Sequence, residues 1–119
     1  MVRRYFLLFL VLTALSAAGA EVAGKWHGRF EVNGEPGENT FEFKVDGEKL
    51  TGTVTSSRFG PGPIVEGVVK GDQIRFAVLR NFQGQEFKLL YSGKVEGDIL
   101  HVSIEVEGNQ ISFDARRVK

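Results

Sequence analysis

Histidine, serine and acidic side chains are the groups in this sequence that could act on a substrate or hold a metal ion. His27 and His101 each fall on the polar face of an alternating segment. A metal site needs several convergent His, Cys, Asp or Glu ligands, and no H-x-H or H-x-x-x-H spacing or acidic cluster accompanies either histidine. We therefore predict two surface histidines and no metal site.

The serines and carboxylates also lack a catalytic pattern. No serine after residue 20 lies in a Gly-x-Ser-x-Gly elbow. A carboxylate pair for glycoside hydrolysis would have to face a cleft, and only Glu66 has a plausible inward orientation. No Gly-rich loop follows a strand and precedes a helix, as a phosphate site would require. The sequence favours a binding protein over an enzyme, without catalytic residues or a cofactor.

Four residues in two polar segments are better candidates for binding. Arg58 and Phe59 precede a Gly-Pro-Gly-Pro run, and Asn81 and Phe82 precede Gln83-Gly84. Aromatic side chains that are exposed beside an arginine are typical of surfaces that bind a protein or a glycan. The alternative is that Phe59 and Phe82 fold down as a lid on the core.

Strands must position these residues, because hydrophobic side chains alternate with polar ones along most of the chain. Eight segments have this pattern, namely 25–32, 40–45, 50–55, 64–69, 74–79, 86–95, 100–106 and 111–116, and in 64–69 the alternation fails across Glu66-Gly67. In the fourth, Ile64 and Val69 can both face inward only if a bulge occurs at Glu66-Gly67. The inward aromatics are Phe30, Phe41, Phe43, Phe76, Phe87, Phe113 and Tyr91, and they predict either a packed core or an aromatic-lined cavity.

Four tight corners join these segments. Each reads Val-x-Gly, then an acid or Asn, then x and Leu or Ile, with glycines at Gly47, Gly71, Gly97 and Gly108. Short connections favour an eight-stranded antiparallel up-and-down barrel over a two-sheet sandwich of the same strands. Three tight turns would lie at one end, and loops at 33–39, 56–63 and 80–85 would lie at the other with the Gly108 turn. We expect the loop-rich end to be the binding end.

The first twenty residues have the composition of a helical signal peptide. Arg3 and Arg4 precede an apolar run from Tyr5 to Leu15, and Ala18-Gly19-Ala20 provides a cleavage site after Ala20. The apolar run is short of the ~20 residues that span a bilayer, so no stable membrane span is expected after cleavage. Residues 21–119 would then form a single domain, secreted or periplasmic. The source is expected to be bacterial.

Charge and cysteine content limit the partners of that domain. The sequence has 15 basic and 15 acidic residues, and loss of Arg3 and Arg4 leaves the remainder slightly acidic. Nucleic-acid binding needs a clustered basic surface, so it is not expected. Cys is absent, and an exported domain of this size must rely on its core rather than on disulfides.

Gly24-Lys25-Trp26 at the first strand and Arg116-Arg117 at the last resemble the calycin superfamily of lipocalins and avidins. Leu50-Thr51-Gly52-Thr53 is also similar to the third strand of avidins. The resemblance implies that Trp26 plugs the closed end of a barrel, with Arg116 or Arg117 stacked on its ring. The Gly-x-Trp-x-Gly start and the repeated corners further resemble small secreted bacterial domains of unknown function.

Three functions remain open from the sequence. The leading one is an exported, non-enzymatic module that binds a protein, glycan or other ligand through Arg58, Phe59, Asn81 and Phe82. The second is a carrier of a small apolar ligand between the inward phenylalanines. The third is an inhibitor of an extracellular hydrolase.

Overall fold

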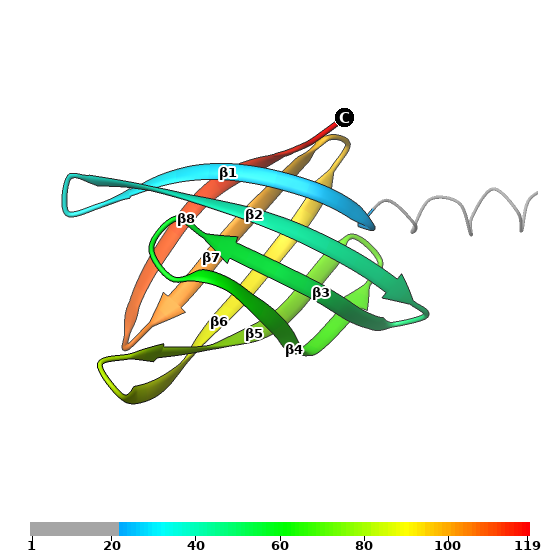
Figure 1. Ribbon diagram of the computed structural model, residues 1–119. Helices are drawn as coiled ribbons and strands as arrows, with labels where there is room; N and C mark the ends of the chain where they lie inside the picture. The colour runs from blue at the N-terminus through cyan, green and yellow to red at the C-terminus, as the bar shows by residue number, and fades with distance from the viewer. Residues whose placement is uncertain (1–21) are drawn as a thin grey trace, which may run out of the picture.

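A computed structural model describes residues 22–119, which form a closed barrel of eight antiparallel strands (Figure 1). The strands are β1 (Gly24–Val32), β2 (Glu35–Asp46), β3 (Lys49–Ser56), β4 (Gly60–Lys70), β5 (Gln73–Phe82), β6 (Gln85–Glu96), β7 (Ile99–Val106) and β8 (Asn109–Arg117). Each strand pairs with the next, and β1 also pairs with β8. This confirms the predicted barrel over the sandwich. The proposed signal peptide, residues 1–20, lies outside the described residues.

The alternation of the sequence becomes an inside and an outside of the barrel. Trp26, Phe41 and Val54 are fully buried, whereas their strand neighbours face outward. In the core, the rings of Phe76 and Tyr91 stack with centroids 4.7 Å apart. The part of the barrel interior around these two rings is therefore filled by side chains. No helix of residues 22–119 is long and apolar enough to cross a membrane.

Two irregularities bend the sheet so that it can close. The β4–β5 register shifts between Val65 and Val68, and Glu66 has a φ of 57°, which confirms the predicted bulge. The β3–β4 register shifts between Leu50 and Thr53. Gly52 lies in this second irregularity with a φ of 140°, and a Cβ there would collide with the carbonyl oxygen of Glu42. A glycine is required where the two backbones approach so closely.

Trp26 and Arg117 seal one end of the barrel. The buried Trp26 indole donates a hydrogen bond to the Val22 carbonyl at 3.0 Å. The guanidinium of Arg117 lies 4.2 Å from the centre of the indole ring and donates to the Asp98 carboxylate at 3.1 Å. Arg116, the other arginine that the resemblance offered for this role, is exposed. Residues from β1, β8 and the β6–β7 turn thus close this end together.

The opposite end has short turns, so the loops predicted at 33–39, 56–63 and 80–85 are wrong. The connections there are 33–34, 57–59, 83–84 and 107–108. Asn33-Gly34 and Gln83-Gly84 have positive φ at both residues, which is the geometry of a two-residue hairpin turn. Such turns let the flanking residues pair at once, and the residues expected in loops extend β2, β4 and β5 instead.

The barrel wall is split along two seams at this end. Pairing between β4 and β5 begins only at Ile64 and Val78, and β1 pairs with β8 only through residues 26–28 and 115–117. The seams divide the open end into a β1–β4 lip, residues 29–39 and 53–63, and a β5–β8 lip, residues 79–90 and 104–114. The β1–β2 and β5–β6 hairpins project from the two lips and diverge (Figure 1).

Candidate binding site at the open end

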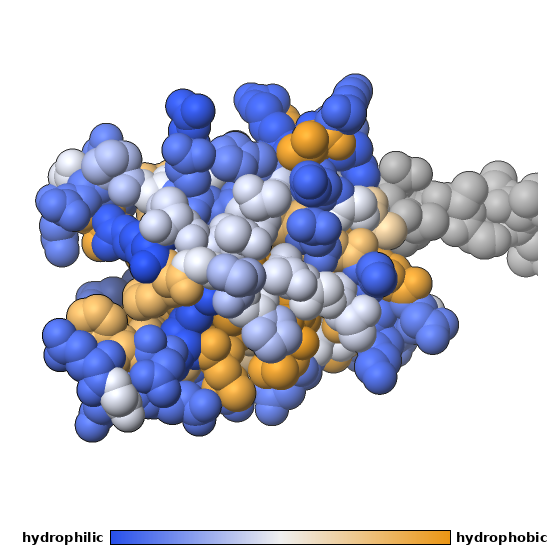
Figure 2. Space-filling view, viewed as in Figure 1, coloured by the Kyte–Doolittle hydropathy of each residue, from blue (hydrophilic) through white to orange (hydrophobic). Residues whose placement is uncertain are grey.

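A cavity of about 920 Å³ lies between the two lips. Figure 2 shows the molecule hollowed at this end, with apolar side chains in the hollow and polar ones around it. Phe30 and Phe59 from the β1–β4 lip and Phe82, Phe87 and Leu89 from the β5–β8 lip supply its apolar walls. The aromatic side chains therefore pack the closed half of the barrel but line a cavity in the open half.

Three of the four residues predicted from the sequence lie around this cavity. Phe59 and Phe82 line it and are 39% and 56% exposed. Arg58 also lines it, and its Nη2 donates to the Glu35 carbonyl at 3.3 Å, which ties the β3–β4 turn to the β1–β2 hairpin. Asn81 is exposed and does not line the cavity. The cavity lining thus includes Arg58, Phe59 and Phe82 but not Asn81.

Phe59 and Phe82 differ in how they lie at the mouth. The Phe59 ring packs edge-on against Phe87, with centroids 5.8 Å apart. It also lies 5.6 Å from the guanidinium carbon of Arg80. Phe82 has no such ring contact among the described residues. Phe59 therefore packs against the cavity wall while staying partly exposed, and Phe82 remains exposed at the rim, so the two rings do not form a buried lid on the core.

A buried polar cluster forms the floor of the cavity, and the sequence analysis missed it. Arg80 on β5 is only 4% exposed, and Asn39 on β2 and Tyr91 on β6 are also buried. Arg80 donates from Nη1 to the Gly60 carbonyl at 3.0 Å and from Nη2 to the Val54 carbonyl at 3.3 Å. These bonds cross the β4–β5 seam where backbone pairing is absent.

The fit of Arg80 into the wall depends on Gly62. A Cβ at residue 62 would lie 2.6 Å from Nη1 of Arg80 and 2.9 Å from Val78. Arg80 also continues the inward series Ile74, Phe76 and Val78. The alternation that places residue 80 on the inward face was visible in the sequence. The predicted strand ended at Leu79, however, so Arg80 was assigned to a loop.

Two polar atoms of the cluster have no hydrogen-bond partner within the described residues. They are Nε of Arg80 and Oδ1 of Asn39. Tyr91 is hydrogen-bonded by the side chains of Asn39 and Arg80. Burial raises the pKa of the Tyr91 hydroxyl, while the charge of Arg80 and the two hydrogen bonds oppose that rise. The cluster therefore holds a neutral phenol beside a buried cation.

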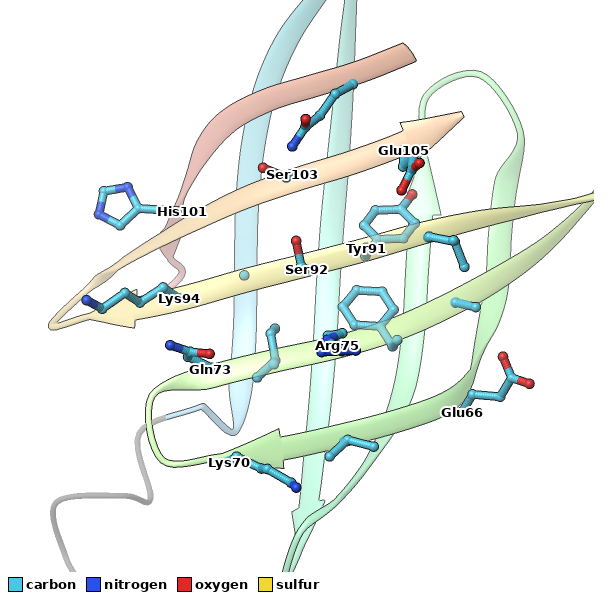
Figure 3. A pocket seen from close by; sticks show the side chains of 17 residues that line it. Glu66, Lys70, Gln73, Arg75, Tyr91, Ser92, Lys94, His101, Ser103 and Glu105 are labelled. Atoms are coloured by element: carbon cyan, nitrogen blue, oxygen red, sulfur yellow. The ribbon is translucent and has the colours of Figure 1, made fainter. Parts of the chain in front are cut away.

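A second hollow, of about 910 Å³, lies over strands β4 to β7 (Figure 3). Arg75, Ser92 and Ser103 are among the polar side chains around it, and Leu90 is an exposed apolar one. Glu66 also borders it, although the sequence left open an inward position for this residue. Glu66 is exposed and pairs with Lys88 at 3.2 Å, because the bulge turns its side chain outward.

Both histidines lie on the outer face and contact carboxylates. His27 lies 2.9 Å from Glu38. His101 lies 2.7 Å from both Asp114 and Glu96, and the hydrogen bonds to these two carboxylates raise its pKa. No group of three or more His, Cys, Asp or Glu side chains in residues 22–119 is arranged to hold a metal ion.

Fold and site together define a small antiparallel β-barrel with one sealed end and one open, cavity-bearing end. No protein-family model, curated protein or solved structure matches this chain.

Proposed function

We propose that this protein is a non-enzymatic binding protein that receives a small molecule in the cavity at its open end. The observation that carries the proposal is the cavity itself, which is bounded by two lips of the sheet and has a volume of about 920 Å³. Small-molecule sites commonly occupy ~300–1,000 Å³ and combine apolar walls with a few polar groups. The phenylalanines of the walls and the polar floor fit that description.

The shape of the mouth supports a small ligand over recognition by long loops. Its connections are two- and three-residue turns, so the binding surface consists of strand residues and hairpin tips. Phe59 and Phe82 stand at the entrance from opposite lips. In this proposal they cover the ligand after it enters, and Arg58 contributes to the rim.

The sealed end supports a distant calycin-like relationship as part of the proposal. The resemblance implied an arginine stacked on the Trp of the first strand, and Arg117 lies in that position. Export by the signal sequence at residues 1–20 would let the barrel take up its ligand outside the cytoplasm. The hydrolase-inhibitor hypothesis stays a prediction, and no observed feature favours it.

Binding of a neutral, fluorescent apolar probe tests the proposed function. We expect N-phenylnaphthylamine fluorescence to rise on addition of the purified protein. A Phe87→Ala variant should bind the probe about tenfold more weakly, because it loses buried apolar contact worth ~1.5 kcal/mol or more. Phe82→Ser should weaken binding in the same direction.

Leu90→Ser is the matched control, because Leu90 is an exposed apolar residue on the outer face of β6. It should bind the probe as the unaltered protein does. Absence of probe uptake, or equal weakening by Leu90→Ser and Phe87→Ala, would show that the cavity is not the binding site.

A further inference from the structure

We infer that the ligand of the open-end cavity is an organic anion, a carboxylate with an apolar body, and that Arg80 receives its charge. This inference rests on the proposed function and adds the chemical class of the ligand to it. A neutral ligand in the same cavity would leave the proposed function intact.

The first step is the position of Arg80. Its side chain lies at the floor of the cavity with 4% of its surface exposed. No carboxylate of residues 22–119 forms an ion pair with it. Two carboxylates, those of Glu31 and Glu107, line the cavity, but both residues are exposed at the rim. The structure thus places one buried cation, without a neutralising anion, against a cavity that opens to solvent.

The second step is energetic. A buried charge without a counter-ion costs several kcal/mol, so buried arginines are usually paired with a carboxylate or another anion. The hydrogen bonds from Arg80 to the Gly60 and Val54 carbonyls explain how the side chain is held. They do not explain why the side chain that bridges the β4–β5 seam is a charged one. They also leave Nε, which lines the same cluster, without an acceptor.

The third step is the hydroxyl of Tyr91. The side chains of Asn39 and Arg80 lie beside this hydroxyl, and both carry N–H donors. The hydroxyl proton is then available to an acceptor, and Oδ1 of Asn39 does not take it. Arg80 Nε–H and Tyr91 O–H are two free donors in one cluster, and a carboxylate offers two acceptor oxygens.

The fourth step is the environment above the floor. Phe30, Phe59, Phe87 and Leu89 line the same cavity as Arg80 and Tyr91, and Phe87 pairs with Arg80 in the β5–β6 register. An anion small enough to be fully hydrated would gain nothing from these walls. An amphipathic acid would place its carboxylate on the floor and its apolar body between the phenylalanines. The remaining orphan, Oδ1 of Asn39, suits a hydroxyl or amide N–H next to the acid.

The test compares two ligands of equal length, dodecanoate and dodecanol, by isothermal titration calorimetry at neutral pH and below their aggregation limits. The protein should bind dodecanoate about 10- to 100-fold more tightly, because hydrogen bonds to a charged group are worth that ratio. Arg80→Met keeps a side chain of similar length and should abolish this preference while still binding dodecanol. Arg75→Met, on the outer face, should keep the preference.

The outcomes separate the two proposals. Equal affinity of the unaltered protein for both ligands would overturn the anion inference and leave the proposed function standing. Failure to bind either ligand would overturn both. Loss of the preference in Arg58→Met but not in Arg80→Met would also overturn the role of Arg80. If Arg80→Met does not fold, Tyr91→Phe decides instead, since it removes only the hydroxyl donor and should reduce dodecanoate affinity selectively.

Discussion

Individual side chains in this barrel differ in whether their charge is satisfied. His101 on the outer face is bound by two carboxylates, whereas Arg80 on the cavity floor has none among the described residues. Solvent screens the first arrangement well and the second, where the arginine is almost fully buried, much less. Arg80 is therefore the residue that the proposed anion would contact, whereas His101 already has its partners within the barrel.

His101 gives a pH-dependent prediction at this scale. Its pKa in the folded protein is raised above the ordinary 6.5 by Asp114 and then Glu96. A raised pKa means that the stabilising effect is fully present below pH 6.5 and is lost as the pH rises through the folded value. We expect the melting temperature to fall slightly as the pH rises from 6.5 through the raised pKa of His101, and to fall less in His101→Gln. Thermal unfolding followed by circular dichroism across that interval measures both.

The comparison with Gln isolates the contribution of His101 from those of all other titratable groups. A His101→Gln protein with the same pH profile as the unaltered protein would show that the two contacts contribute nothing to folding.

Whole elements explain what could be predicted from the sequence and what could not. Alternation was sufficient for all eight strands, because each has one buried and one solvated face, and the misfit at Glu66-Gly67 located the bulge. Pro61, Gly62 and Pro63 read as a loop, yet they lie in β4 and pair with β3 only. A proline is tolerated there because the seam beside β5 requires no ladder donor.

The cavity residues show the same limit. Phe59 and Phe82 could be singled out because they stand among turn-forming residues. Asn39, Arg80 and Tyr91 could not be grouped, because their association depends on which strands face each other across the barrel and on where backbone pairing stops. The register between strands that are distant in sequence decides which residues come together, and the local alternation of the sequence does not determine that register.

The seal between β1, β8 and the β6–β7 turn yields a stability prediction at the scale of elements. Arg117→Met should destabilise the protein by about 1–3 kcal/mol, since it removes the cation–π contact with Trp26 and the hydrogen bonds to Asp98 and to the Ala23 carbonyl. Urea denaturation monitored by Trp26 fluorescence would measure the change in the free energy of unfolding.

Arg116→Met is the matched control, because Arg116 is next to Arg117 in β8 and its side chain is exposed. It should change stability by less than ~0.5 kcal/mol. Equal effects of the two substitutions would mean that Arg117 does not hold the sealed end together.

The molecule as a whole is asymmetric along the barrel axis. One end is closed by packed aromatic side chains, an arginine and backbone pairing between all neighbouring strands, and the other separates into two lips along the β4–β5 and β8–β1 seams. Segments with fewer buried contacts and fewer backbone hydrogen bonds open at lower free energy. The lips should therefore move relative to each other while the sealed half stays fixed.

Hydrogen exchange measured by mass spectrometry tests this difference in mobility. Amides in 29–32, 79–82 and 109–114 should exchange faster than those in 40–45 and 74–78, because the seams leave the first group with fewer partners. Dodecanoate should slow exchange in both lips if it bridges them. Uniform exchange along each strand would show that the seams do not weaken the open end.

The last residues of the chain run along the sealed end, where the Val118 amide bonds to the Lys25 carbonyl. A tether attached after Lys119 would consequently hold the barrel by its base and leave the mouth directed away from the support. The protein could be immobilised on a sensor chip in this way without obstructing the entrance, and a fusion partner joined at that residue would stand clear of any incoming ligand.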